Sequence, residues 1–210
     1  MEQDQKTYWE SKWKREDKIG KPNPFAKKII PLIKKRDLKK ILDLGCGDGR
    51  DTIYFAKNGF SVLAVDFSEN AIEKLKKELI QRNIKNVKCK VMDISTDLKY
   101  MKSCGFDVIY AHLSLHYFDD ETTTKIFNEL HRILKKNGLI FIKVKSINDP
   151  LYGKGKLIEK DMFLYDHIRH FFSKEYMREK LRKFKILRMR KTSSVYHKHK
   201  SSFIEVIATK

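Results

Sequence analysis

The stretch Ile41-Leu-Asp-Leu-Gly-Cys-Gly-Asp-Gly49 decides the fold. An apolar run over residues 40–44 enters three closely spaced glycines, and a helical pattern follows from about Arg50 to Asn58. Glycines permit a tight turn and a close approach of the backbone to a ligand. A strand that passes through such a turn into a helix is the place where doubly wound sheets bind nucleotides.

The rest of the chain repeats this alternation of strand and helix. Further strands are expected over 60–65, 87–92, 106–111 and 139–144. Pro22 and Pro24 are expected to open a helix that ends at about Arg36. Two more helices are expected, one over 69–82 with Ser68 as N-cap and one from Asp119 or Asp120 to Asn137-Gly138. Such alternation predicts a parallel sheet with helices on both faces. After a helix over 173–184, two extended segments, 186–191 and 202–208, have no helix between them and should pair as an antiparallel hairpin. We therefore expect an α/β, Rossmann-like, doubly wound seven-stranded sheet, mostly parallel with one antiparallel strand near the C-terminal edge.

The 210 residues are expected to form a single domain, 1–210. Residues 1–20, which carry Tyr8, Trp9 and Trp13 on a charged background, are expected to be an N-terminal lid-like arm. Residues 146–172 are expected to be a loop region on the substrate side, where Gly153 and Gly155 allow movement.

Cysteine usage and hydropathy restrict the protein class. Cys46, Cys89 and Cys104 show no C-x-x-C spacing, so neither a disulfide framework nor a metal site is expected. Met1–Arg15 lacks the apolar run of a signal peptide, and no stretch approaches a membrane span. These features favour a cytoplasmic protein without a membrane partner, and the oligomeric state stays open between monomer and dimer.

Three carboxylates follow three successive predicted strands. Asp43 precedes the glycine turn, where a dinucleotide would place its pyrophosphate, so its charge disfavours a dinucleotide and suits an ammonium group. The dinucleotide pattern also requires a third glycine at the position of Arg50. Asp66 is placed to accept from ribose hydroxyls, and Asp93 from an adenine amino group. A nicotinamide-dependent oxidoreductase is therefore the least favoured function.

These motifs carry a resemblance to a known family. Asp43-x-Gly-x-Gly-x-Gly49, Asp66 and Met92-Asp93-Ile94 resemble the first motifs of the class I S-adenosylmethionine-dependent methyltransferases, over residues 39–145. Gly49-Arg50-Asp51, Tyr54-Phe-Ala, Asn58-Gly-Phe60 and Val65-Asp-Phe-Ser68 are similar to the tellurite-resistance and thiopurine methyltransferase-like branch. The resemblance implies S-adenosylmethionine as cofactor and S-adenosylhomocysteine as product. The expected cofactor-binding residues are Asp43, Gly45, Cys46, Gly47, Gly49, Arg50, Asp66, Phe67, Asp93, Ile94 and Trp13. Arg50 either meets the cofactor carboxylate or is a surface residue at a helix start.

Catalytic candidates lie in Tyr110-Ala-His-Leu-Ser-Leu-His-Tyr117, after the fourth strand. Methyl transfer needs alignment and a dry pocket, and a general base only where the acceptor arrives protonated. His112 is the first candidate for lining the acceptor pocket, followed by His116; a structural role for these histidines is the alternative. Tail residues that could also reach an acceptor are His167, Arg169, His170, Tyr196, His197 and His199.

The net charge of +19 raises the question of a nucleic-acid partner. Lysines are scattered over the expected helices, which indicates a solvated surface, although residues 173–200 hold eleven Lys or Arg against two acids. A lysine-rich sheet edge would explain that excess. We therefore expect a small-molecule acceptor. The alternatives are an RNA methyltransferase and a catalytically silent cofactor-binding partner subunit.

Overall fold

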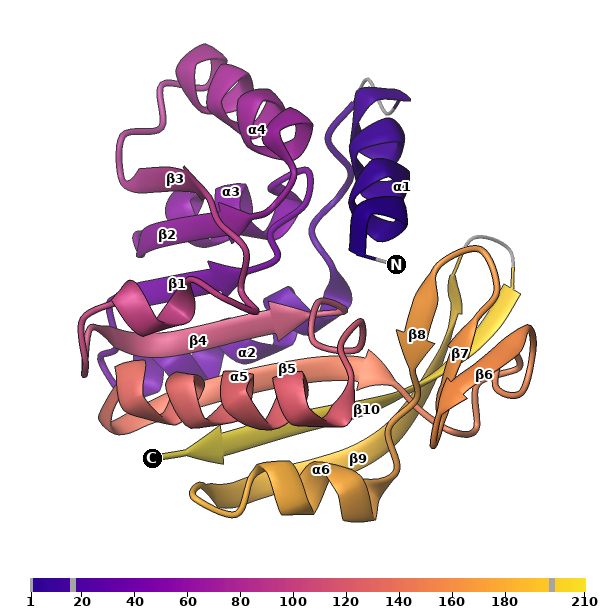
Figure 1. The fold of residues 1–210 in the computed structure, drawn as a ribbon. Coiled ribbons are helices and arrows are strands. Elements are labelled where there is room, and N and C mark those ends of the chain that lie inside the picture. Colours follow the sequence, from indigo (N-terminus) through magenta and orange to yellow (C-terminus); the bar gives the residue numbers. More distant parts are fainter. Residues whose placement is uncertain (1, 16–17, 197–198) are drawn as a thin grey trace.

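A seven-stranded sheet runs through the centre of the molecule (Figure 1). The computed structural model describes residues 2–15, 18–196 and 199–210, with the side chains of 2–4, 196 and 199 left out. The strand order is β3-β2-β1-β4-β5-β10-β9. The strands are β1 (Lys40–Leu44), β2 (Ser61–Asp66), β3 (Val87–Val91), β4 (Phe106–His112), β5 (Leu134–Lys145), β9 (Lys185–Tyr196) and β10 (His199–Thr209).

Strand directions confirm the predicted topology. The pairs β1–β2, β2–β3, β1–β4 and β4–β5 are parallel, whereas β10 is antiparallel to both β5 and β9. The single reversed strand is therefore β10, and the basic strand β9 forms one edge of the sheet. This confirms the α/β fold with one antiparallel strand near the C-terminal edge.

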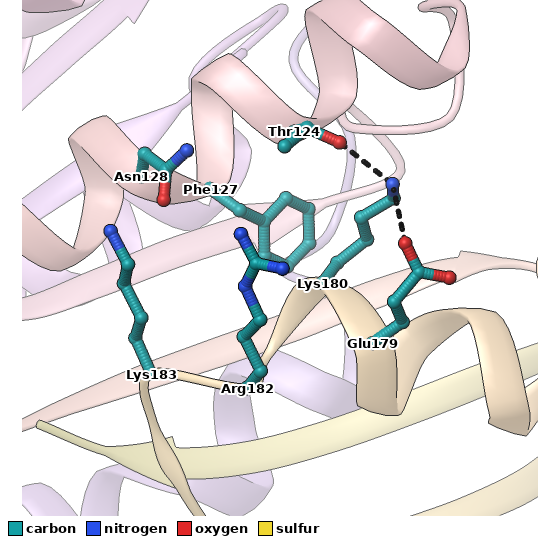
Figure 2. Close-up of a pocket in the computed structure, with 7 residues that line it drawn as sticks. All are labelled: Thr124, Phe127, Asn128, Glu179, Lys180, Arg182 and Lys183. Carbon is teal, nitrogen blue, oxygen red and sulfur yellow. Dashed lines mark hydrogen bonds and ion pairs between the residues drawn. The ribbon is translucent and has the colours of Figure 1, made fainter.

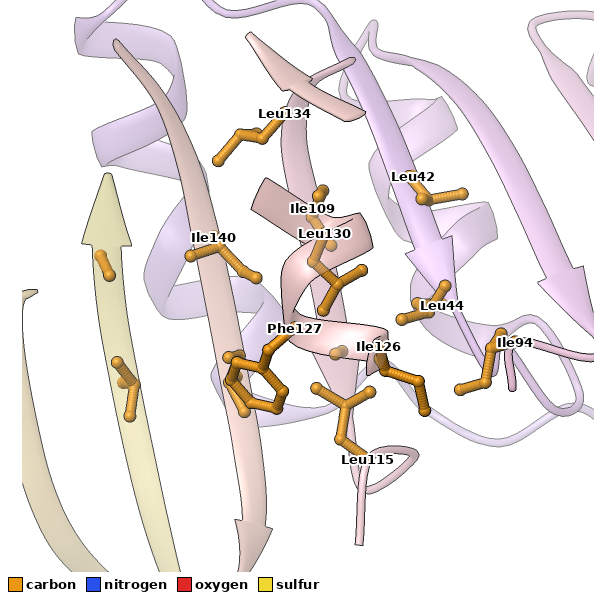
Figure 3. Close-up of a cluster of buried hydrophobic side chains, with 14 of the residues drawn as sticks. Leu42, Leu44, Ile94, Ile109, Leu115, Ile126, Phe127, Leu130, Leu134 and Ile140 are labelled. Carbon is orange, nitrogen blue, oxygen red and sulfur yellow. The ribbon is translucent and has the colours of Figure 1, made fainter. Parts of the chain in front are cut away.

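Helices cover both faces of the sheet. They are α1 (Glu2–Arg15), α2 (Pro24–Lys35), α3 (Arg50–Lys57), α4 (Glu69–Gln81), α5 (Asp120–Ile133) and α6 (Lys174–Lys180), with a short 3₁₀ helix at Leu98–Tyr100. On one face, α5 packs Ile126, Phe127 and Leu130 onto the sheet (Figure 3). On the other, α2 and α3 bury Ile29, Phe55 and their neighbours. The sheet's central strands are thus buried on both sides, as parallel strands require.

Side-chain hydrogen bonds cap the N-termini of α4 and α5. The Ser68 hydroxyl accepts from the backbone N–H of Ala71 at 3.1 Å, which confirms Ser68 as the N-cap of α4. Asp119 accepts from the N–H of Thr122 at 2.7 Å and caps α5. These caps set where each chain segment leaves the carboxyl edge of the sheet.

Two expected elements differ from those observed. The helix expected to end at Asn137-Gly138 ends at Ile133, because the fully buried Leu134 is already extended and pairs with Phe106 at the start of β5. Residues 146–172, expected to be a loop, contain a small antiparallel sheet of β6 (Lys156–Glu159), β7 (Met162–Leu164) and β8 (Ile168–His170). Strands of three or four residues are too short to show a periodic pattern.

No helix among the described residues combines the length and the apolar character needed to cross a lipid bilayer.

Candidate functional site

A cavity of about 1300 Å³ lies beyond the carboxyl ends of the parallel strands. Its lining comes from the glycine turn, the ends of β2, β3 and β4, helix α1, and residues between β5 and β10. Figure 1 shows α1 and the β6–β8 sheet standing on the same side of the central sheet, beyond the arrowheads of β4 and β5. The fold therefore brings segments far apart in sequence to one place.

The glycine turn forms the floor of the cavity at the end of β1. Gly47 has φ +53°, and a Cβ there would lie 2.6 Å from the Trp13 ring, so only glycine permits α1 to pack so close. Gly45 and Gly47 line the cavity, and Cys46, Phe67 and Ile94 line it beside them. Gly49 lies behind the turn, where it caps α3 and faces Leu75, so it supports the site without lining it.

The three predicted carboxylates line the same cavity. Asp43 is 2% exposed and accepts from the Thr52 hydroxyl at 2.5 Å. Asp66 is also buried and accepts from the backbone N–H groups of Gly47 at 2.8 Å and Ser68 at 3.0 Å. Asp93 is exposed. The structure therefore brings all three strand-end carboxylates together, as the sequence predicts.

The charge of this cluster is poorly compensated. Burial, together with the negative charges of Asp51, Asp66 and Asp48, raises the pKa of Asp43 to about 8, although the Thr52 hydrogen bond opposes the shift. Burial likewise raises the pKa of Asp66 to about 6. A ligand that places a positive charge beside Asp43 would favour the ionised carboxylate and lower its pKa. These carboxylate acceptors fit a cofactor that carries an ammonium and a sulfonium.

The sequence leaves the role of Arg50 open, and the structure places both Arg50 and Cys46 in the cavity lining. The Arg50 guanidinium lines the cavity while it donates to the Asp48 carboxylate, with an Nη2–Oδ2 distance of 2.6 Å. Asp48 also accepts from the N–H of Gly20, so this pair ties the segment before α2 to the turn. Burial raises the pKa of the Cys46 thiol, which makes it a packing residue and a poor nucleophile.

Both catalytic candidates line the cavity. His112 stacks on Tyr110 at a centroid distance of 6.1 Å, and burial lowers its pKa to about 3, helped by the charges of Lys143 and Arg50. His116 is 1% exposed, and burial and then Lys145 and Arg169 lower its pKa far below the usual range. Both imidazoles are therefore neutral at pH 7 and available as hydrogen-bonding groups rather than as charges.

Helix α1 is held over the cavity at two places. The Glu10 carboxylate accepts from the Ser68 hydroxyl and the Glu69 N–H, both at 2.8 Å, and from the Asn70 amide at 2.7 Å, at the start of α4. On the other side, Trp9 contacts the rings of Tyr117 and His167 at 5.4 Å. The predicted arm is thus a helix that bridges the two ends of the cavity.

Replacing Glu10 with Ala is expected to loosen α1, because four polar groups at the start of α4 lose their acceptor. Both tryptophans of the chain lie in α1, so intrinsic fluorescence reports its docking. We expect a red-shifted emission and faster quenching by acrylamide, with the thermal midpoint little changed. Glu121→Ala, an exposed change on α5, is the control. Unchanged quenching in Glu10→Ala would show that the aromatic contacts alone hold the helix.

Several lining residues were not expected from the sequence. Lys145 ends β5, donates to Asp149 at 2.8 Å and to the Ser201 hydroxyl at 3.0 Å, and lines the cavity with Ser201. The sequence feature that could have predicted Lys145 is its position at the carboxyl end of a strand, as for Asp43 and Asp66. His167 and Arg169, suggested only as tail residues, also line the cavity, whereas His170 does not appear in its lining. The side chains of Tyr196, His197 and His199 lie outside the described residues.

Comparisons with known proteins agree with this geometry. A family model described as a methyltransferase domain matches residues 41–138. A Geobacillus sp. protein named as a methyltransferase is 32% identical over 66% of this chain and 56% of its own length. Phosphoethanolamine N-methyltransferase 1 of Triticum aestivum is 29% identical over 73% of this chain and 32% of its own. The chain therefore spans about half or less of the length of these relatives.

Solved structures share the fold at low sequence identity. An S-adenosylmethionine-dependent methyltransferase of Methanosarcina mazei superposes with a TM-score of 0.75 at 22% identity, covering 86% of this chain and 97% of that one. TehB of Haemophilus influenzae gives 0.70 at 20%, over 98% and 67%. The 1,6-didemethyltoxoflavin-N1-methyltransferase of Burkholderia thailandensis, solved with its acceptor and S-adenosylhomocysteine, gives 0.68 at 22%, over 90% and 77%. Residues 41–138, a little less than half of the chain, thus match the methyltransferase-domain family, and the chain has the fold of the solved S-adenosylmethionine-dependent methyltransferases and of TehB.

Proposed function

We propose that the protein transfers a methyl group from S-adenosylmethionine to a small-molecule acceptor. The observation that carries this is the convergence of Asp43, Asp66 and Asp93 on one cavity beside the glycine turn. The Burkholderia relative in fold, solved with a small heterocyclic acceptor, supports a small-molecule acceptor for a chain of this architecture.

In this proposal, different residues of the chain bind different parts of the cofactor. Asp43 meets the ammonium, Arg50 the carboxylate, Asp66 the ribose hydroxyls and Asp93 the adenine amino group, while Phe67 and Ile94 flank the base. Trp13 covers the glycine turn from α1. When bound, the cofactor supplies a methyl group that is already activated on a sulfonium. The protein's part is to align the acceptor and to exclude water.

His112 and His116 serve the acceptor in this scheme. A neutral imidazole can take the proton that a hydroxyl or amine acceptor loses. Their strongly lowered pKa values make both weak bases in the absence of ligand, so hydrogen bonding that orients the nucleophile is their main contribution. The basic edge strand β9 adds little support for an RNA acceptor, because its Arg190 is already paired with Glu205, with an Nη2–Oε2 distance of 2.6 Å.

Calorimetry tests the cofactor assignment. S-Adenosylmethionine and S-adenosylhomocysteine are expected to bind, and NADH is not. Asp66→Ala removes a buried acceptor and should weaken S-adenosylhomocysteine by about 1.5–3 kcal/mol, the range for hydrogen bonds to charged groups. Asp107→Ala, at the opposite end of β4, is the matched control and should leave affinity unchanged. Tight NADH binding, or full affinity in Asp66→Ala, would place the cofactor elsewhere.

A partner subunit without chemistry is the alternative to an enzyme. Labelled cofactor incubated with a metabolite extract distinguishes them, since an enzyme transfers the label to some acceptor and His116→Ala slows the transfer. A protein that binds S-adenosylhomocysteine, transfers no label and co-purifies with a stoichiometric partner would be the silent subunit.

A further inference from the structure

The cavity is divided by charge along its length. The part near the glycine turn is lined by six carboxylates and one cation, Arg50, which is paired with Asp48; the carboxylates are Asp43, Asp48, Asp51, Asp66, Asp93 and Asp97. The part formed by α1 and by residues after β5 is lined by the cations Lys12, Lys145, Lys154, Arg169 and Lys200. We call this second part the basic half. The cofactor as placed above, positively charged at its ammonium and sulfonium, leaves the basic half for the acceptor.

The carboxylates of the basic half are held by protein groups. Asp119 accepts from the N–H of Thr122 and Glu159 from the N–H of Asp120, both as fixed parts of the chain around α5. Asp166 accepts from the Arg169 guanidinium. These contacts position the acids but do not remove the excess of positive charge around them.

Lys145 and Arg169 are held in place and have more N–H donors than their printed partners use. Lys145 is nearly buried, and Asp149 and Ser201 take two of its three N–H donors. The Asp166 carboxylate accepts from two nitrogens of the Arg169 guanidinium, which has five N–H donors. Lys12 sits 4.6 Å from the Trp9 ring centroid. A ligand therefore meets oriented cationic groups without having to order free side chains.

Three residues that line the cavity each have a buried polar atom without a partner among the described residues. His116 Nδ1, His167 Nδ1 and Trp9 Nε1 have no hydrogen-bond partner among the described residues, and all three residues line the cavity. His167 Nδ1 lies 3.3 Å from the Asp166 carboxylate without hydrogen-bond geometry, and burial lowers its pKa to about 4, so it is neutral. Buried polar groups left without partners are rare in folded proteins. The three residues lie close together, because Trp9 contacts the rings of Tyr117 and His167 at 5.4 Å and Tyr117 contacts that of His116 at 4.3 Å.

The cations and the unpartnered atoms belong to one locality. Next to burial, Lys145 and Arg169 lower the pKa of His116, and Arg169, Lys12 and Lys145 lower that of His167. The backbone N–H of His170 also donates to the His116 carbonyl at 3.0 Å, which places the strand that carries Arg169 beside His116. We propose that the methyl acceptor is an anionic small molecule, whose phosphate or carboxylate group binds in the basic half between Lys145, Arg169 and the imidazoles of His116 and His167.

This proposal rests on the methyltransferase function proposed above, and its test separates the two. Protein saturated with S-adenosylhomocysteine is titrated with inorganic phosphate and, separately, with acetate, at constant ionic strength. We expect saturable binding of at least one anion, with the preferred anion showing which group the acceptor carries. Arg169→Gln should weaken it about tenfold, the effect of losing one charge-assisted hydrogen bond. Lys200→Gln, an exposed change, should weaken it less.

The matched control is Lys183→Gln on the segment after α6. Lys183 lies with Arg182 and Lys180 over a separate small pocket against α5, away from the cavity (Figure 2). The Lys183→Gln change removes one positive charge, as Arg169→Gln does, and should leave anion affinity unchanged. Absence of saturable binding by either anion, or equal weakening in Lys183→Gln and Arg169→Gln, would overturn the proposal. Loss of S-adenosylhomocysteine binding would instead count against the proposed function.

The acceptor itself can be found by its charge. A cell extract is passed over an anion exchanger at pH 7, and each fraction is incubated with the protein and labelled S-adenosylmethionine. The acceptor is expected in the retained fraction, and Arg169→Gln should raise KM for that fraction more than it lowers kcat. Acceptor activity confined to the unretained fraction would refute an anionic acceptor while leaving the methyltransferase function intact.

Discussion

Binding of S-adenosylhomocysteine at pH 7 is expected to release about one proton, and Asp43→Asn should abolish that release. With a pKa of about 8, the Asp43 carboxyl is mostly protonated at pH 7 in the free protein. An ammonium placed beside it favours the carboxylate, so the proton leaves as the ligand binds. Calorimetry in two buffers of different ionisation enthalpy counts the protons directly.

The sign of the pH dependence follows from the same shift. Below pH 8, binding must remove a proton from Asp43, so affinity should rise about tenfold per pH unit up to about pH 8 and then level off. Methylthioadenosine, which lacks the amino-acid part, is the control ligand and should release no proton at pH 7. Asp43→Asn should weaken S-adenosylhomocysteine by about 1.5–3 kcal/mol. Proton uptake, or affinity that falls from pH 6 to pH 8, would contradict the placement of the ammonium.

Stability of the free protein checks that Asp43→Asn folds. The native state keeps the Asp43 proton up to about pH 8, whereas the unfolded chain loses it near the usual Asp pKa of about 3.9. The native state therefore binds more protons between these values, and the contribution of Asp43 to stability is lost as pH rises through that window. Asp43→Asn should raise the thermal midpoint relative to the wild type at pH 8 even as it weakens the ligand.

Gly49→Ala is expected to be among the most destabilising single changes. Its φ is +77°, and an added Cβ would lie 2.3 Å from a methyl carbon of the fully buried Leu75. Overpacking costs about 1–3 kcal/mol, and a left-handed conformation at a residue with a Cβ costs roughly 1–2 kcal/mol more. Denaturant unfolding measures the change in the free energy of unfolding.

Two further experiments separate the steric overlap with Leu75 from the backbone strain at Gly49. Gly59 has φ +89°, but a Cβ added there would have no atom of the described residues within 4 Å beyond its chain neighbours, so Gly59→Ala should show the backbone cost alone. Leu75→Ala removes the clashing methyl groups and by itself costs about 2–5 kcal/mol. The double variant should then be less destabilised than the sum of the two single changes. Strict additivity would show that Leu75 simply moves aside.

The sequence predicted those parts of the molecule that rest on local patterns. The glycine turn, the carboxylates Asp43 and Asp66, and the Ser68 cap each follow from residue types next to a strand end. The reversed β10 followed from the missing helix between two extended segments. Signals of this kind need no knowledge of distant contacts.

The acceptor side could not be predicted in the same way. Lys145 and Ser201 are 56 residues apart and meet only because β10 returns beside β5. The β6–β8 strands are too short for a periodic pattern, and the role of Glu10 depends on a contact with Asn70 across 60 residues. Residues that act through long-range packing leave no local pattern in the chain.

The order of the two halves along the chain has an evolutionary consequence. The cofactor carboxylates fall within residues 41–138, which match the methyltransferase family model, whereas α1, Lys145, Arg169 and Ser201 fall outside it. The β6–β8 sheet is moreover tied to the central sheet by connections at its two ends, between β5 and α6. Residues 146–172, which carry His167 and Arg169, form one contiguous segment between β5 and α6, so descent with change can exchange this wall of the cavity while the carboxylates of residues 41–138 are retained.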